Sequence, residues 1–341
     1  MRNALSCFFP TTVVLVDDDQ DVLHKLKNIL EKTNVICKSF TNPDKALKYI
    51  YDANCNKLNF CSVLRAGEYD TSEEKSALLN ICLIHKEIYS QDRFLKISAV
   101  ISDYYMPEMN GPDFCESLCD RNIQRILLTD KAEDYQALNE FNKNNITSFI
   151  RKDDKDFDSE IVERVNIAAH QYFNLYTQVV KTFLGEEGGH LVDTRFLDLV
   201  LSDLWHSSDR KFVEYYMIDA YGGYLLLDAD GKVGVLSVYT ESEIDKLLEI
   251  AVDAKADEEV IKKLESRKYI LVFHSRTGQL PPVEEWKNHL RPAQHCHCTY
   301  QNYYFFVDEF GSNIKLDLDF DKIISYNKFK MSQEIASQMR K

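Results

Sequence analysis

Five polar residues in the first half of the chain lie at or directly after the ends of short apolar runs. They are Asp17, Asp18, Asp103, Thr129 and Lys152. Three carboxylates at one site repel one another unless a cation shares the space, and Mg²⁺ prefers oxygen ligands of this kind. A carboxylate beside Mg²⁺ can attack phosphorus and form an aspartyl-phosphate. The Lys152 ammonium would then neutralise charge on the phosphoryl group, and the Thr129 hydroxyl would bind one of its oxygens.

The segments that must bring these residues together alternate between strand-like and helix-like patterns. Strands are predicted at 13–16, 35–40, 99–101, 126–128 and 146–150, and helices at 20–32, 43–51, 112–119 and 132–142. This alternation is typical of a parallel, doubly wound α/β sheet, here with five strands. Because the carboxyl ends of parallel strands share one edge, we expect the five polar residues to converge there.

The length of 341 residues favours about two domains. We predict a first domain over 1–158 with an insertion at about 52–96, which includes a helix at 72–89. A long helix is predicted over 159–184, and its apolar stripe could pack within the chain or against a second copy. Residues 185–341 are predicted to form a separate α+β domain. Its predicted elements are a hairpin at 224–238, helices at 243–253 and 257–267, and strands at 269–273, 303–307 and 314–320.

The composition excludes several classes of protein. The 41 basic and 55 acidic residues give a net charge of −14, which argues against nucleic-acid binding. No run of 18 apolar residues exists, so we expect no membrane span. The apolar stretch 4–16 has no cleavage site of small residues and is predicted to be a buried first strand. Nine scattered cysteines, an odd number, indicate reduced thiols and a cytoplasmic protein.

Four motifs follow one another on the predicted strand ends. They are Val-Val-Leu-Val-Asp-Asp at 13–18, Asp-Tyr-Tyr-Met-Pro-Glu-Met-Asn-Gly at 103–111, Leu-Leu-Thr at 127–129 and Phe-Ile-Arg-Lys at 149–152. With these motifs, residues 11 to about 155 resemble the receiver domain of a two-component response regulator. The resemblance implies a flavodoxin-like fold that accepts a phosphoryl group from a sensor histidine kinase or a phosphotransfer protein.

The same resemblance implies a set of metal ligands and a phosphoryl acceptor. Asp103 would accept the phosphoryl group. Asp18 and Asp103 would bind Mg²⁺ directly, Asp17 would bind it through water, and Tyr105 would bind it through the backbone carbonyl. A degenerate receiver that is never phosphorylated is the alternative.

The resemblance also implies a switch around the phosphoryl group. Lys152 would contact this group, Thr129 would reorient to bind it, and the Phe149 ring would rotate inward with Thr129. Pro107 and Gly111 would shape the loop after the acceptor.

Three residues near the motifs bear on how the site would work. Asp130 stands where receivers usually have a small residue, and its charge would repel an incoming phosphoryl group unless it points away. Asp153 replaces the usual proline after the lysine, so the usual cis peptide is not expected. Tyr105 is bulky, and we expect it to restrict attacking water and prolong the life of the phosphoryl group.

The insertion supports a second, looser resemblance. The segments Ile-His-Lys-Glu-Ile-Tyr at 84–89, Asp-Arg-Phe at 92–94 and Tyr-Leu-Leu-Leu-Asp-Ala-Asp-Gly at 224–231 resemble an uncommon group of proteobacterial response regulators. In that group the receiver carries a helical insert and an unclassified C-terminal domain. Some members accompany quorum-sensing kinases of the Legionella type.

The second half contains weaker candidates for chemistry. In the His-Cys-His-Cys run at 295–298, either His295 with His297 or Cys296 with Cys298 could bind a metal. A structural zinc site needs four ligands, so ordinary strand residues are the simpler interpretation.

Two other patterns in the second half have simpler explanations. Gly311-Ser312 with Asp317 and Asp319 is similar to a nucleotidyltransferase site, although the gap is shorter than in that family. A solvated face of an edge strand is the favoured interpretation of these carboxylates. The Asp-Ala-Asp-Gly segment at 228–231 begins like a calcium loop but has Tyr239 at the twelfth position, so a turn is expected.

These patterns predict a signalling switch and not an enzyme, apart from phosphoryl transfer that the receiver itself catalyses. Phosphorylation of Asp103 would change the oligomeric state, through a homodimer, or the binding of an unidentified downstream protein. The alternative is a receiver-gated nucleotide-binding or nucleotidyltransferase-like output domain. A DNA-binding regulator is a weaker third hypothesis, which the net charge opposes.

Overall fold

The computed structural model describes most of the chain. The described residues are 7–31, 33–55, 87–130, 134–184, 200, 212–217, 223–273, 280–298, 301–308 and 319–338. The chain divides into two compact units. One comprises Phe9–Leu58, Gln91–Leu175 and Ser332–Lys341, and the other comprises Met1–Phe8, Asn59–Ser90 and Tyr176–Met331. The domain limits predicted from the sequence at 158 and 184 stay a prediction.

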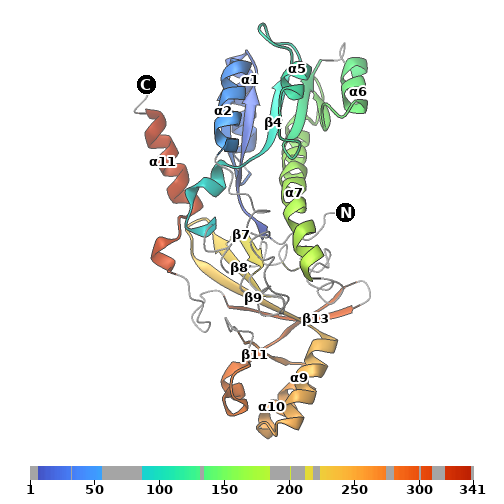
Figure 1. Ribbon diagram of the computed structural model, residues 1–341, viewed down its shortest axis with the longest axis vertical. Coiled ribbons are helices and arrows are strands. Elements are labelled where there is room, and N and C mark those ends of the chain that lie inside the picture. The colour runs from blue at the N-terminus through green and yellow to red at the C-terminus, as the bar shows by residue number, and fades with distance from the viewer. Residues whose placement is uncertain are drawn as a thin grey trace. The chain divides into compact units, whose positions relative to one another are not determined.

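The unit that begins at Phe9 is built on a five-stranded parallel sheet (Figure 1). Its strands are β2 (Thr11–Val16), β3 (Val35–Phe40), β4 (Ile97–Asp103), β5 (Gln124–Thr129) and β6 (Ser148–Arg151). They lie in the order β3-β2-β4-β5-β6, and every neighbouring pair is parallel. The predicted flavodoxin-like, doubly wound sheet is therefore confirmed.

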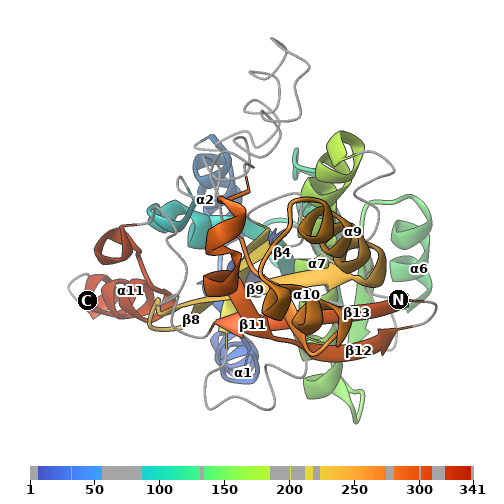
Figure 2. The same ribbon diagram turned by 90° about the horizontal axis from the view of Figure 1, so that it is seen from below.

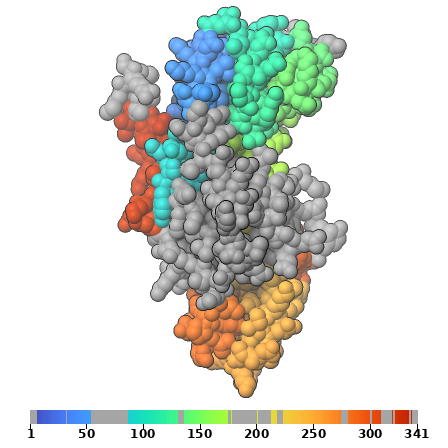
Figure 3. All heavy atoms as spheres, viewed as in Figure 1, coloured from blue at the N-terminus to red at the C-terminus, as the bar shows by residue number. Residues whose placement is uncertain are grey.

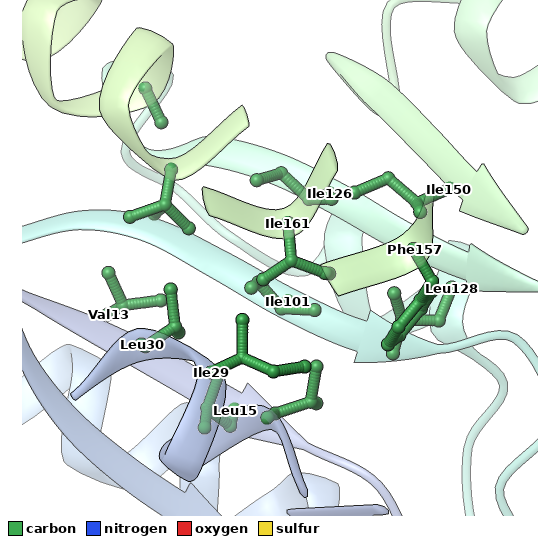
Figure 4. Close-up of a cluster of buried hydrophobic side chains, with 14 of the residues drawn as sticks. Val13, Leu15, Ile29, Leu30, Ile101, Ile126, Leu128, Ile150, Phe157 and Ile161 are labelled. Atoms are coloured by element: carbon green, nitrogen blue, oxygen red, sulfur yellow. The ribbon is translucent and has the colours of Figure 1, made fainter. Parts of the chain in front are cut away.

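Helices cover both faces of this sheet and explain why the central strands β2 and β4 are buried at every position. The helices are α1 (Gln20–Leu30), α2 (Pro43–Cys55), α5 (Gly111–Glu116), α6 (Asp134–Asn142) and α7 (Phe157–Leu184), with a 3-10 turn η1 (Gln91–Leu95) before β4. Val13 and Leu15 of β2 pack with Leu26 of α1 and Ile161 of α7 on one face (Figure 4). Side chains of α2, α5 and α6 pack on the other face.

Local sequence explains where α1 begins and which of its faces is buried. The Asp19 side chain caps the helix by accepting a hydrogen bond from the backbone N–H of Asp21 (2.8 Å). Four apolar residues at helical spacing then face the sheet: Leu23, Leu26, Ile29 and Leu30. The cap places the helix directly after the Asp17-Asp18 pair and fixes the position of that pair at the end of β2.

The other unit contains a six-stranded antiparallel sheet (Figure 2). Its strands are β1 (Cys7–Phe8), β7 (Phe212–Met217), β8 (Gly223–Asp228), β9 (Val233–Thr240), β12 (Gln294–Cys298) and β13 (Gln301–Asp308), in the order β1-β7-β8-β9-β13-β12. A small second sheet pairs β10 (Tyr269–Leu271) with β11 (Leu290–Pro292). With its helices, this unit is the separate α+β domain predicted from the sequence.

Helices and turns complete this second unit. They are α9 (Glu241–Asp253), α10 (Glu258–Glu265), η4 (Val283–His289) and η5 (Phe320–Lys322), and helix α11 (Tyr326–Gln338) is divided between the two units after Met331. The side chains of Thr240 and Glu243 form a capping box at the start of α9. Helices α9 and α10, gold in Figure 3, lie at the surface around the buried Trp286.

The structure corrects three predicted elements. The stretch 4–16 is not one strand, because Cys7–Phe8 pairs with β7 while β2 begins only at Thr11, after Pro10. The helix predicted at 112–119 ends at Glu116, where the Ser117 N–H bonds to the carbonyls of Asp113 and Cys115. Phe320, predicted to end a strand, lies instead in a 3-10 turn.

Some predictions fall on residues that the structure does not describe. The predicted helix at 72–89 lies outside the described residues except for its last residues, where 87–88 are helical. Residues 314–318 of the predicted strand at 314–320 also lie outside them. No helix within the described part of the chain is long and apolar enough to cross a membrane.

Candidate functional site

The three acidic residues predicted to share one site do come together. Asp17 and Asp18 directly follow β2, and Asp103 is the last residue of the neighbouring strand β4. Each offers a carboxylate oxygen, and these oxygens lie within 4.8 Å of one another. Asp17 is 1 % exposed and Asp103 is 9 % exposed, whereas Asp18 faces solvent. The parallel pairing of Val16 with Ser102 explains why the two strand ends meet.

Lys152 supplies the positive charge at this cluster. Its Nζ lies 2.6 Å from Oδ1 of Asp103 and 3.3 Å from Oδ2 of Asp17. The backbone N–H of Lys152 donates to the carbonyl of Thr129 (2.9 Å), which holds the loop after β6 against the end of β5. Burial lowers the pKa of Lys152, but its hydrogen bond to Asp103 and the nearby carboxylates outweigh this effect, so the pKa is raised. Lys152 therefore stays charged near neutral pH.

Asp17 is the acid of the cluster whose negative charge is least well stabilised. Burial raises the pKa of its carboxyl above the ordinary value, and the charge of Asp103 adds to this effect. The backbone N–H of Asp19 (2.9 Å) and the ammonium of Lys152 oppose the shift without cancelling it. The negative charge on Asp17 is thus only partly compensated, so a further cation bound beside it would stabilise the carboxylate.

Thr129 ends the next strand along the sheet. Its side chain is fully buried, and its Oγ1 has no hydrogen-bond partner in the described part of the chain. A buried hydroxyl without a partner costs free energy, so it marks a position at which a ligand oxygen or a rearrangement is needed. This property fits a group that binds phosphoryl oxygen only when the site is loaded.

The loop after Asp103 is fixed by a close backbone approach. The N–H of Gly111 donates to the carbonyl of Tyr104 (2.8 Å), and the N–H of Tyr104 donates to the carbonyl of Leu128 (3.0 Å). Tyr105 is 61 % exposed, and its ring meets the Tyr104 ring edge to face at 4.8 Å. Tyr105 therefore presents an aromatic side chain to solvent two residues after the acceptor.

Gly111 is expected to tolerate no side chain. A Cβ at this position would lie 2.2 Å from the carbonyl oxygen of Asp103 and 2.5 Å from a methyl group of Leu127. Gly111→Ala should therefore lower the free energy of unfolding by about 1–3 kcal/mol, measured by urea titration. Gly234→Ala is the control, since a Cβ there would lie no closer than 3.0 Å to the Phe212 ring and 3.5 Å to the carbonyl oxygen of Asp308. An equal or smaller loss for Gly111→Ala would contradict this reading of the loop.

The other residues singled out near the motifs also have defined surroundings. Phe149 is partly buried against the core on the α2, α5 and α6 face. Asp130 is exposed, and Asp153 forms two hydrogen bonds with the Arg151 guanidinium at 2.8 and 3.1 Å. The bond between Lys152 and Asp153 is trans, like the other described peptide bonds. Arg151 therefore holds the Asp153 carboxylate, and the sequence analysis did not anticipate this partner.

The histidines and cysteines of the run at 295–298 have different surroundings. His295 and His297 lie on one face of β12, and a ring nitrogen of each contacts Oδ1 of Asn302 on β13. Asn302 was not singled out from the sequence, because only the pairing of β12 with β13 places it there. Cys298 is buried, and Cys296 is partly buried.

The remaining two patterns give no catalytic arrangement among the described residues. Ser312 and Asp317 lie outside those residues, and Asp319 is exposed and pairs with Lys322 (2.8 Å). Oδ1 of Asp228 accepts hydrogen bonds from the N–H groups of Asp230 (2.9 Å) and Lys232 (2.8 Å). The segment 228–231 is thus the hairpin turn between β8 and β9 that the sequence predicts.

The acidic cluster fits the Mg²⁺ that the motifs imply. Mg²⁺ binds few protein ligands, prefers carboxylate and carbonyl oxygen, and keeps several waters. Asp18 and Asp103 would bind it directly, Asp17 through water, and the carbonyl of Tyr105 would complete the set. The exposure of Asp18 leaves solvent access for the waters.

Comparisons with known proteins bear on the whole chain. No protein-family model and no curated protein matches it. Among solved structures, the Legionella pneumophila response regulator LqsR matches with a TM-score of 0.78 and 28 % identity, over 96 % of this chain and 95 % of that one. The chain has the architecture of a response regulator. This similarity confirms the resemblance to response regulators that the motifs predicted.

Other solved structures match about half of the chain. A response regulator receiver domain protein from Clostridium thermocellum has 16 % identity and a TM-score of 0.32, over 50 % of this chain and 98 % of that one. The receiver domain of an HD domain-containing protein from Pseudomonas fluorescens Pf-5 has 19 % identity and a TM-score of 0.30, over 48 % and 90 %. These TM-scores are too low to add to the argument.

Proposed function

We propose that this protein is a phosphorylation switch in which Asp103 accepts a phosphoryl group with the help of Mg²⁺. The observation that carries the proposal is the convergence of Asp17, Asp18 and Asp103 within 4.8 Å, with Lys152 Nζ 2.6 Å from Asp103. The donor is the phosphohistidine of a sensor histidine kinase or of a phosphotransfer protein. The resemblance to regulators that accompany quorum-sensing kinases makes such a kinase the expected donor.

The proposed chemistry is a simple transfer. A carboxylate oxygen of Asp103 attacks phosphorus, the new O–P bond forms as the P–N bond to the donor histidine breaks, and the histidine nitrogen leaves with the electron pair. Mg²⁺, when bound, would neutralise charge on the transferring oxygens. Lys152 exchanges its contact with the Asp103 carboxylate for one with a phosphoryl oxygen, and the buried Thr129 hydroxyl gains a partner. Hydrolysis of the aspartyl-phosphate by water resets the switch.

The proposed output is a change in protein association. Thr129 would move toward the phosphoryl group, and Phe149 would follow into the space that Thr129 vacates. The altered surface would then change the oligomeric state or the protein partner of the C-terminal α+β domain. We propose no chemistry for that domain.

Light scattering behind size exclusion tests this proposal. Wild type and Asp103→Asn are compared with Mg²⁺, with and without beryllium fluoride as a phosphoryl mimic, beside intact-mass detection of phosphorylation by acetyl phosphate. We expect one added phosphoryl group in wild type, none in Asp103→Asn, and a mass near twice 39.7 kDa only in the activated wild type. Failure of wild type to take up phosphoryl would refute the proposal. Uptake without a mass change would move the output to partner binding or to a change within the monomer.

Tyr105 is expected to set the lifetime of the phosphorylated state. Its exposed ring lies two residues after Asp103 and can cover the path of attacking water. Tyr105→Ala should speed dephosphorylation several-fold, measured by loss of radiolabel from purified phosphoprotein. Tyr51→Ala is the matched control, since Tyr51 is similarly exposed (68 %) on α2. Unchanged dephosphorylation of Tyr105→Ala would end this interpretation.

A further inference from the structure

Lys152 follows an edge strand of the parallel sheet. In the described sheet β6 pairs with β5 alone, whereas β2 and β4, which carry the acids of the site, have a paired strand on both sides. The last pair of β6 joins Thr129 and Arg151, and the bond from the N–H of Lys152 to the carbonyl of Thr129 (2.9 Å) extends this pairing by one residue. The sheet therefore holds Lys152 from one side.

The position of the Lys152 ammonium depends on the backbone that carries it. A lysine ammonium lies at the end of a flexible stem, so its place in a site is set by the direction in which the stem leaves the chain. Here Nζ contacts both Asp103 (2.6 Å) and Asp17 (3.3 Å). A rotation of the backbone at Lys152 would move Nζ away from both carboxylates. Restraining that backbone therefore stabilises both contacts.

The residues on either side of Lys152 are joined to each other. Nε and Nη2 of Arg151 donate to Oδ1 (3.1 Å) and Oδ2 (2.8 Å) of Asp153, one bond to each carboxylate oxygen. A bidentate pair of this kind fixes orientation as well as distance. Together with the chain between the two residues, this bridge closes a ring that contains the backbone of Lys152. The bridge thereby restricts the dihedral angles of Lys152.

Backbone bonds restrain the rest of the same loop. The N–H of Asp154 donates to the carbonyl of Arg151 (3.3 Å), which closes a turn with Lys152 and Asp153 at its centre. The N–H of Phe157, the first residue of α7, donates to the carbonyl of Asp154 (3.3 Å). The turn is thus joined to β6 at one end and to α7 at the other, and the bridge spans its centre.

The bridge acts through position and not through net charge. Arg151 and Asp153 carry opposite charges, so the pair adds no net charge beside the phosphoacceptor. Their side chains are 34 % and 54 % exposed, and an exposed ion pair contributes little to the free energy of unfolding. We therefore expect loss of the bridge to change the contacts of Lys152 and not the stability of the fold.

We propose that the bridge between Arg151 and Asp153 positions Lys152 against Asp103, which makes both members of the bridge positioning residues for phosphoryl transfer. The role in transfer rests on the proposed function of Asp103, whereas the contact of Lys152 with Asp103 is made before any phosphoryl group arrives. When the bridge is broken, the ammonium is less often in place to neutralise the transferring oxygens.

Labelling of Lys152 with acetic anhydride tests the bridge without phosphoryl transfer. The ammonium must lose its proton to react, and the contact with Asp103 opposes that loss, so a released Lys152 is labelled faster. The full chain is labelled in chelator, and peptide mass spectrometry compares Lys152 with the exposed Lys155. We expect about three- to ten-fold faster labelling of Lys152 in Arg151→Met and in Asp153→Ala. The swapped variant Arg151→Asp/Asp153→Arg should return to the wild-type rate.

The rate of phosphoryl uptake from acetyl phosphate in Mg²⁺ is the second measurement. Each single variant should lower the maximal rate about ten-fold and change the half-saturating concentration of acetyl phosphate less than about two-fold. In a Lys152→Met chain, Asp153→Ala should have no further effect, because the bridge acts through that lysine. Arg164→Met, which breaks the exposed pair of Arg164 with Glu160 (3.3 Å) on α7, is the matched control and should leave both measurements unchanged.

The two measurements separate the bridge from the phosphoacceptor. Unchanged labelling of Lys152 in the single variants, or no recovery in the swapped variant, would overturn the proposal whether or not wild type takes up phosphoryl. Faster labelling in a chain that takes up none would refute the proposed function and support the positioning of Lys152. A further loss of rate from Asp153→Ala in the Lys152→Met chain would overturn the role in transfer. Urea titration of each variant confirms that faster labelling does not reflect unfolding.

Discussion

Replacing Lys152 with methionine is expected to slow phosphoryl uptake at Asp103 by about 10²–10³-fold. The ammonium contacts Asp103 at 2.6 Å and Asp17 at 3.3 Å, and methionine keeps much of the side-chain volume without the charge. The transferring group would then lose one of the two cations, Mg²⁺ and the Lys152 ammonium, that we propose to neutralise it. Uptake is measured by intact mass after mixing with acetyl phosphate and Mg²⁺. Lys155→Met, at an exposed position three residues on, is the control.

The same substitution should also lower stability when Mg²⁺ is absent. It leaves the buried Asp17 and Asp103 carboxylates facing each other without their cation, which should cost about 1–3 kcal/mol after allowance for the 25 % exposure of Lys152. Mg²⁺ should restore more stability to this variant than to wild type, because it replaces the missing charge. Uptake within two-fold of wild type, or equal stabilisation by Mg²⁺, would show that Lys152 is dispensable.

The sequence was most informative where the chain is regular and locally patterned. The apolar run before Asp17 and the helical spacing from Leu23 to Leu30 predict one strand and one helix without reference to the rest of the chain. Parallel topology then predicts that Asp17 and Asp103 meet, since the ends of β2 and β4 lie side by side. Topology does not predict the distances between individual side chains. The contacts of Lys152 and the unsatisfied hydroxyl of Thr129 depend on side-chain packing.

The predictions failed where pairing is non-local or elements are short. The two residues of β1 carry no periodic pattern, and their partner strand β7 lies far along the chain. The sequence does not single out Asn302, because only the pairing of strand β12 with strand β13 places it opposite His297. Helix α5 ended early because the next hydrogen bond, from the Leu118 N–H to the Cys115 carbonyl, spans three residues and not four, and this change has no clear sequence signal. Boundaries of short elements are therefore the least predictable features.

Asp17→Asn is expected to make the metal-free protein more stable while weakening its binding of Mg²⁺. The pKa of Asp17 is raised because burial disfavours its charged form, and the nearby Asp103 carboxylate adds to the cost. A neutral amide of the same shape removes that cost, so the free energy of unfolding of the variant should exceed that of wild type at neutral pH. Loss of the Asp17 charge, which would contact Mg²⁺ through water, should weaken Mg²⁺ binding at least ten-fold. Asp52→Asn, exposed on α2, is the control for a change of net charge alone.

The pH dependence of this gain identifies its cause. An acid whose pKa is raised by folding binds its proton more tightly in the folded chain, so its contribution to stability becomes less favourable as pH rises. The decline begins near the ordinary value of 3.8 and is complete above the raised pKa of Asp17. The stability difference between Asp17→Asn and wild type should therefore be small in acid, grow through this window and then stay constant. Denaturant titrations in chelator from pH 4 to pH 8 measure it. A difference that is independent of pH would show that packing, and not charge at Asp17, separates the two proteins.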